Sequence, residues 1–184
     1  MKIQVLNISF VQYYSLKDKS LYNYYLEYAK LPAIDLFKIG DIFDAPFGFV
    51  KDMQDYLNHT GLTWEIFIDE ISKFKHIPKT RVVKNSLFDM QSARLWLREQ
   101  VIKINDLEAS ALGYASSAEE QAAGIEVFSK FRAFLQFDNL SGGDVTKIEA
   151  VRALPYSTCF AKLKLDADRA EYNQKLNEIL KHRK

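Results

Sequence analysis

The chain has 184 residues, of which 48% are hydrophobic and 27% are charged, and this composition excludes a wholly disordered protein. Its 25 Lys and Arg nearly cancel its 24 Asp and Glu, so no global positive field exists to attract nucleic acid or anionic lipid. Four Pro and seven Gly are few for this length, which favours long helices over a β fold with many turns.

The N-terminal residues 3–14 are rich in β-branched and aromatic side chains with partial alternation, and they are the best strand candidate in the chain. A lone strand is unstable, so this segment must pair with another segment or chain, or else form a helix or an arm. We therefore treat residues 1–15 as a candidate β-strand or extended arm. Residues 16–30 have helical spacing that ends before Pro32, and residues 33–39 are expected to add a short helix.

The middle of the chain predicts three helices from their start and stop signals. An Asp-Ala-Pro step at residues 44–46 starts a helix that runs to Asn58. Thr63 caps the next helix, which Pro78 ends. Residues 86–112 form the longest run with helical character.

A capping box at Ser117–Glu120 predicts a further helix that runs to about Phe137. Gly124 lies inside it at a cost of roughly 1 kcal/mol relative to Ala. The apolar residues of this helix are expected to lie in the core; they are Val127, Phe128, Phe131, Phe134 and Leu135.

The C-terminal residues 138–184 are expected to form a helical hairpin. Gly142 and Gly143 supply a turn, a second capping box at Thr146–Glu149 opens a short helix, and Pro155 starts the last helix. Residues 1–184 together predict one mainly α, compact multi-helix domain. The apolar face of the last helix is expected to comprise Phe160, Leu163, Ala167, Ala170, Leu176 and Ile179.

Residue types that form catalytic or metal sites are scattered along the chain. The three His are far apart in sequence, and the single cysteine, Cys159, excludes both a thiolate cluster and an internal disulfide. The Gly142-Gly143 pair lacks the Lys-Ser/Thr of a phosphate-binding loop. We therefore expect no enzymatic activity, no cofactor and no metal. No apolar run reaches the roughly 18 residues of a membrane span, and no signal-peptide core is present, so we expect a cytoplasmic protein without a membrane partner.

Six of the ten tyrosines lie in the first thirty residues, where a helix would place them on all sides. Tyrosine is enriched at protein interfaces, because it presents a rigid apolar body with a polar tip. Two interpretations remain open: a partner-binding surface, for another protein or for a second copy of the chain, or a packing helix with solvated hydroxyls. The candidate partner-binding residues are Tyr14, Tyr22, Tyr24, Tyr25 and Tyr28.

An alternative function is DNA binding by a helix-turn-helix unit over residues 146–165. Its cations would be Lys162 and Lys164, and a basic connector upstream would add Lys75, Lys79, Arg81 and Lys84. Proline rather than glycine at the turn and the neutral charge of the chain count against this alternative. Nucleic acid is therefore the less favoured partner.

Residues 140–176 resemble the C-terminal part of small helical proteins of tailed bacteriophages, among them tail assembly chaperones. The shared features are a Gly/Asp loop, a short helix, the Leu154-Pro155-Tyr156 step and a charged amphipathic helix. The Leu31-Pro32 and Pro46-Phe47-Gly48 steps resemble the same proteins. The resemblance implies a non-enzymatic protein of the host cytoplasm that binds tape-measure or tail-tube subunits. It is almost as compatible with a structural component of the virion.

Overall fold

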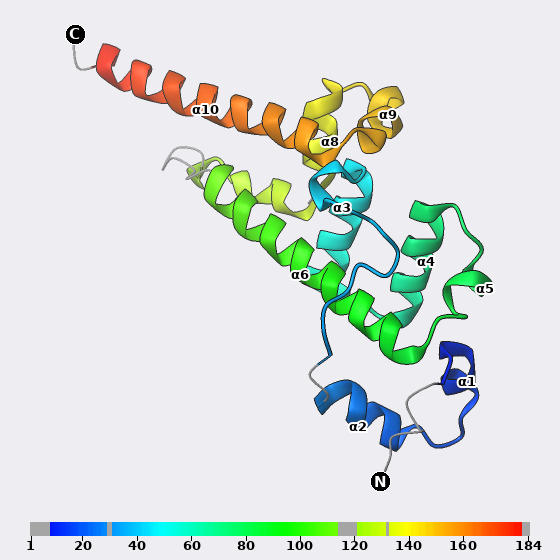
Figure 1. The fold of residues 1–184 in the computed structure, drawn as a ribbon. Coiled ribbons are helices and arrows are strands. Elements are labelled where there is room, and N and C mark those ends of the chain that lie inside the picture. Colours follow the sequence, from blue (N-terminus) through cyan, green and yellow to red (C-terminus); the bar gives the residue numbers. More distant parts are fainter. Residues whose placement is uncertain (1–7, 29–30, 114–120, 132, 182–184) are drawn as a thin grey trace. The chain divides into compact units, whose positions relative to one another are not determined.

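The computed structural model describes residues 8–28, 31–113, 121–131 and 133–181, and within these ranges it contains helices and no strand (Figure 1). The prediction of a mainly α, multi-helix protein is confirmed. Contacts divide the chain into two compact units. Unit 1 comprises Met1–Asp41 and Tyr56–Ile102, and unit 2 comprises Ile42–Asp55 and Lys103–Lys184.

The first described element is the helix α1, Phe10–Ser15, and not a strand. Ser9 and Gln12 form a capping box, in which the Ser9 hydroxyl accepts from the Gln12 amide and the Gln12 side chain accepts from the Ser9 amide. Phe10 and Tyr13, one helical turn apart, are buried. The strand prediction is therefore wrong for residues 8–14, apart from an isolated bridge between Ser9 and Ser86. Its first residues lie outside the described ranges.

Helix α2 spans Ser20–Tyr28, within the helix predicted from residues 16–30. The short helix predicted over residues 33–39 is wrong, because the Asp35 carboxylate binds the backbone there. It accepts hydrogen bonds from the amides of Ile39 at 2.7 Å and Gly40 at 2.8 Å. Such side-chain acceptors compete with helical hydrogen bonding, and they hold this segment as a turn.

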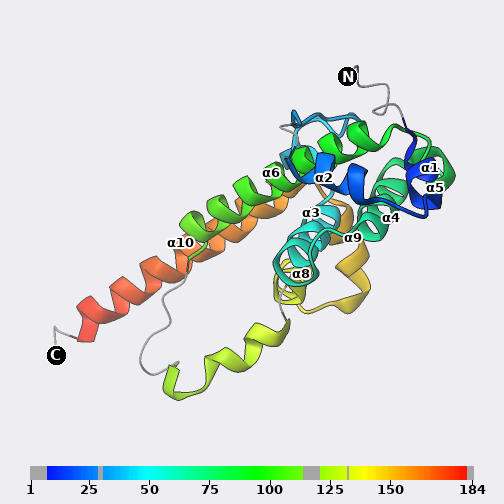
Figure 2. The same cartoon turned by 90° about the horizontal axis from the view of Figure 1, so that it is seen from below.

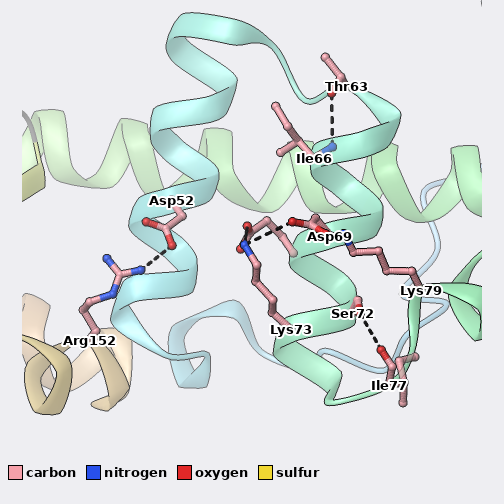
Figure 3. Close-up of polar contacts among 10 residues, drawn as sticks. Asp52, Thr63, Ile66, Asp69, Ser72, Lys73, Ile77, Lys79 and Arg152 are labelled. Carbon is pink, nitrogen blue, oxygen red and sulfur yellow. Dashed lines mark hydrogen bonds and ion pairs between the residues drawn. The ribbon is translucent and has the colours of Figure 1, made fainter.

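The rest of unit 1 is built from η3, a π-helical turn at Tyr56–Thr60, the helices α4 (Trp64–Lys75) and α5 (Lys79–Val82), and the first part of α6 (Leu87–Ala111). The predicted cap of α4 is confirmed, since the Thr63 hydroxyl accepts from the Ile66 amide (Figure 3). The core of unit 1 is apolar and includes Phe67, Ile71, Val82, Leu87, Met90 and Leu97.

Unit 2 joins an early segment of the chain to its C-terminal part. The early segment holds η2 (Ile42–Asp44) and α3 (Phe47–Asp55), and an isolated bridge between Pro46 and Pro155 holds the start of α3 beside the start of α10, Tyr156–Lys181. Two backbone hydrogen bonds support this bridge, from Phe47 to the Leu154 carbonyl and from Tyr156 to the Ala45 carbonyl.

The remaining elements of unit 2 are η4 (Ile125–Phe131), α8 (Ala133–Ser141), η5 (Val145–Lys147) and α9 (Ile148–Ala153). Helices α3 and α9 pack closely at Gly48. A Cβ atom on Gly48 would lie 2.9 Å from the Cβ of Arg152, which is closer than real Cβ atoms approach. The Arg152 guanidinium also pairs with Asp52 of α3 at 2.6 Å (Figure 3).

The continuous helix predicted from Ser117 to Phe137 is wrong. Gly124 adopts a left-handed conformation with φ of 81°, which ends the turn before it, and the chain continues as the 3₁₀ helix η4 and then as α8. The capping box that opened the predicted helix lies outside the described residues. A second capping box, predicted at Thr146–Glu149, is also wrong, because Asp144 caps η5 by accepting from the Thr146 amide at 3.0 Å.

Helix α10 begins after Pro155, as predicted, but only its first half is covered within unit 2. Leu163 is buried, whereas all side chains from Asp168 to Leu180 are exposed. The predicted apolar face is therefore wrong for Ala170, Leu176 and Ile179. Pairs of opposite charge spaced by four residues support this solvated stretch; they are Lys162–Asp166, Lys164–Asp168 and Glu171–Lys175.

Candidate interaction surface

The largest departure from the expected core lies in η4 and α8 of unit 2. Five large apolar side chains that the sequence places in the core are instead between 39% and 54% exposed. We call them the 127–135 surface; they are Val127, Phe128, Phe131, Phe134 and Leu135. Soluble proteins rarely leave contiguous apolar patches exposed unless the patch binds something.

The geometry of η4 explains why two of these rings lie on one side. A 3₁₀ helix has three residues per turn, so Phe128 and Phe131 are eclipsed on the same face. Seven residues is long for a 3₁₀ helix, and the segment lies at an edge of unit 2, away from α9 (Figure 2). One residue of this region, Phe137 on α8, is buried, and its ring contacts Phe47 with centroids 5.4 Å apart.

The N-terminal tyrosines that were predicted to bind a partner differ in their surroundings. Tyr14 and Tyr24 are exposed, with Tyr14 resting against Phe10 at 5.4 Å between ring centroids. Tyr22 is half-buried and contacts the edge of the buried Tyr13 ring. The side chains of Tyr25 and Tyr28 lie outside the described residues. The two exposed rings, Tyr14 on α1 and Tyr24 on α2, keep open the interpretation that these helices contact a partner.

The connector cations of the DNA-binding alternative lie at the end of α4, on α5 and, for Lys84, in the turn that follows α5. Lys79 pairs with Asp69, and the Lys75 ammonium donates to the Lys38 carbonyl at 2.7 Å (Figure 3 shows the Asp69 pair). Arg81 and Lys84 are exposed. Two of the four cations thus already have an acceptor within unit 1.

The unit proposed as a helix-turn-helix differs in shape from its prediction. Its first helix, α9, has six residues, and only Leu154 and Pro155 separate it from α10. Lys162 and Lys164 on α10 each pair with an aspartate one turn further on. A DNA-binding turn usually has three or four residues. DNA binding therefore stays a prediction, and the geometry of this unit does not support it.

A buried polar cluster holds unit 2 together, and no local sequence pattern indicates it. Lys51 of α3 is 4% exposed and donates to both oxygens of Glu108 on α6, at 2.6 and 2.7 Å. The Tyr156 hydroxyl of α10 donates to the same carboxylate at 2.6 Å, and the Gln54 amide adds a bond at 3.1 Å. One carboxylate therefore joins three helices. Such a shared acceptor fixes their register.

Burial and charge act in opposite directions on the groups of this cluster. Burial lowers the pKa of the Lys51 ammonium, and the adjacent Glu108 carboxylate offsets part of that effect. Burial and the hydrogen bond to Glu108 both raise the pKa of Tyr156, so its hydroxyl stays a donor. The arrangement of these groups, with one carboxylate accepting from three side chains, is that of a structural lock.

Cys159 lies beside this lock and provides a test of it. The thiol is buried, its pKa is raised by burial, and Lys51 only partly opposes that shift. We expect Cys159 to react with a thiol-specific disulfide reagent at least about 100-fold more slowly in the native protein than in guanidinium chloride. Because it is the single cysteine of the chain, the absorbance of the released thiolate measures it alone. Equal rates in the two conditions would contradict the packing of α10 described above.

The described residues hold no group of three His, Cys, Asp or Glu side chains that could bind a metal ion. Among the same residues, no helix combines the length and the hydropathy that crossing a membrane requires. No protein-family model, no curated protein and no solved structure matches this chain.

Proposed function

We propose that this protein is a non-enzymatic interaction protein whose 127–135 surface binds an apolar groove on another protein. The observation that carries the proposal is the exposure of five large apolar side chains, three of them phenylalanines, on η4 and the start of α8. Aromatic side chains at the centre of an interface contribute most of its binding energy. Three phenyl rings are a plausible anchor for one partner.

The chemistry of the surface defines the partner. Lys130 is its only charged side chain among the described residues from 127 to 135, and its ammonium lies 5.1 Å from the centroid of the Phe131 ring. Phe128 and Phe131, on successive turns of η4, resemble the anchors of a helix that inserts into a groove, and Phe134 adds a third exposed ring at the start of α8. The partner should therefore supply a concave apolar surface with a polar rim.

A narrower form of the proposal rests on the resemblance of residues 140–176 to small tail proteins of bacteriophages. In that form the partner is a tail or other virion protein, and the chain assists assembly or is built into the particle. Genes for tail or capsid proteins beside this one would support it. A neighbourhood without such genes would remove the narrower form and leave the broader one standing.

The test compares the affinity of the wild-type chain for a partner with the affinities of two serine variants for the same partner. Immobilised protein first selects partners from extract, and each one is then purified and titrated by calorimetry against the wild type. We expect Phe128→Ser with Phe131→Ser to weaken binding at least about 100-fold, because two anchors are lost. Val145→Ser is the control, since Val145 is 67% exposed in the same unit but lies outside the surface.

Two results would contradict the proposal. One is a partner that binds the double variant as tightly as the wild type. The other is a loss of affinity in Val145→Ser that equals the loss in the double variant, which would indicate nonspecific adhesion. Circular dichroism of the double variant should match the wild type, because exposed side chains contribute little to stability.

A further inference from the structure

Unit 1 contains a pocket that the proposed function does not use. It lies between η3, the loop before α4, and one face of α6, and its apolar wall is formed by Leu57, Leu62 and Leu95. Its volume is about 270 Å³, slightly below the range that is usual for drug-sized ligands. The space therefore suits a small molecule or one chemical group.

The polar wall of the pocket consists of Gln91, Arg94 and Arg98. Positions 91, 94 and 98 follow one another at helical spacing, so α6 presents all three on the same face. The Arg94 guanidinium lies 4.9 Å from the centroid of the Trp64 ring, which holds it in a fixed orientation. Two cations thus converge on one concavity.

Neither arginine has a counter-ion in the part of the chain that the structure describes. Burial lowers the pKa of Arg94, and the neighbouring charge of Arg98 lowers it further. The side-chain oxygen of Gln91 is buried and has no hydrogen-bond partner among the described residues. The half-buried Arg94 cation and the unsatisfied Gln91 oxygen are unfavourable unless something else completes them, and Arg98 adds an exposed second cation to the same pocket.

We propose that this pocket binds a small phosphate monoester, with the phosphate between Arg94 and Arg98. A hydrogen-bond donor elsewhere on the same ligand then donates to the side-chain oxygen of Gln91. A phosphate monoester carries close to two negative charges near neutral pH, which matches two guanidinium groups. The planar guanidinium fork also fits phosphate oxygens in pairs, whereas a single carboxylate would neutralise only one arginine. The lining residues that the structure describes include no lysine and no third cation, so they offer a nucleic acid backbone no continuous track.

Calorimetric titration of the full chain with glycerol phosphate and with inorganic phosphate tests the inference. We expect saturable one-to-one binding of glycerol phosphate with a Kd of about 1 mM or tighter. Arg98→Gln should weaken it at least about tenfold, and Arg98→Lys should give an intermediate loss, because the charge remains but the fork is lost. Arg81→Gln is the matched control, since Arg81 is exposed in unit 1 and lies outside the pocket.

Arg94→Gln should weaken binding as well, but Arg94 packs on Trp64, so the exposed Arg98 provides the decisive variant if Arg94→Gln unfolds. Gln91→Leu should remove any preference for glycerol phosphate over inorganic phosphate. The inference is overturned if no saturable binding occurs up to about 10 mM of either probe. It is also overturned if Arg98→Gln binds as the wild type does, or if a single-stranded oligonucleotide binds at Arg98 more tightly than the monoester.

Discussion

Replacing Lys51 by Met is expected to lower the free energy of unfolding of unit 2 by about 3–5 kcal/mol. The substitution keeps an unbranched apolar stem but removes the ammonium that neutralises Glu108, whose side chain is 14% exposed. The carboxylate would retain only the Tyr156 hydroxyl and the Gln54 amide as donors. A buried charge without its counter-ion costs far more than the pair contributes when both partners are present.

The measurement is urea unfolding followed by two probes. Both tryptophans, Trp64 and Trp96, lie in unit 1, whereas the single cysteine, Cys159, lies in unit 2. The reactivity of this thiol in increasing urea should therefore report how far Lys51→Met lowers the free energy of unfolding of unit 2. The double variant Lys51→Met with Glu108→Leu should recover part of this loss, because an apolar pair replaces the charged one while the buried Tyr156 hydroxyl loses its acceptor.

A matched control for Lys51→Met is Lys175→Met, which breaks the exposed Glu171–Lys175 pair on α10. Exposed pairs contribute little, so its unfolding midpoint should equal that of the wild type. Equal midpoints for Lys51→Met and Lys175→Met would show that the buried lock does not hold unit 2 together.

Replacing Phe47 by Ala is expected to destabilise unit 2 by about 3–5 kcal/mol, the usual cost of removing a fully buried ring. The Phe47 ring is completely buried, lies 5.9 Å from the Tyr156 ring between centroids, and is 5.4 Å from the Lys51 ammonium. The resulting cavity would open beside the lock, since the surrounding helices cannot fully collapse into it.

The same urea titration, with Cys159 as the probe, measures the effect of Phe47→Ala. Phe128→Ala removes the same atoms from an exposed position of the same unit, and we expect it to change stability by less than about 0.5 kcal/mol. A large loss in Phe128→Ala would mean that Phe128 is a core residue, as its spacing in the sequence had suggested, and would contradict its exposure.

Local chemistry made much of the fold predictable. Thr63 marks the start of α4 because a hydroxyl at that position satisfies a free amide of the first turn. Pro155 marks the start of α10 because its ring suits the first turn of a helix. Such signals act within a few residues, so a single sequence is sufficient to read them.

The features that were missed depend on distant parts of the chain. Lys51 and Glu108 are 57 residues apart, and nothing in their local sequence indicates that they pair. Likewise, the spacing of Phe128 and Phe131 predicts an apolar face, but it does not distinguish a face buried in the core from one exposed on the surface. Sequence periodicity identified these rings as a set, and only the tertiary structure shows that unit 2 leaves them uncovered.

Hydroxyl-radical footprinting tests most directly whether the 127–135 surface binds a partner, because it measures the solvent exposure of each ring. In the free protein, Phe128, Phe131 and Phe134 should be oxidised readily, while the buried Phe47 and Phe67 should be protected. In the purified complex with its partner, oxidation of the first three should fall at least about fivefold, because an anchor ring is desolvated at an interface. Unchanged oxidation of these rings in the complex, or their protection in the free chain, would contradict the proposed function.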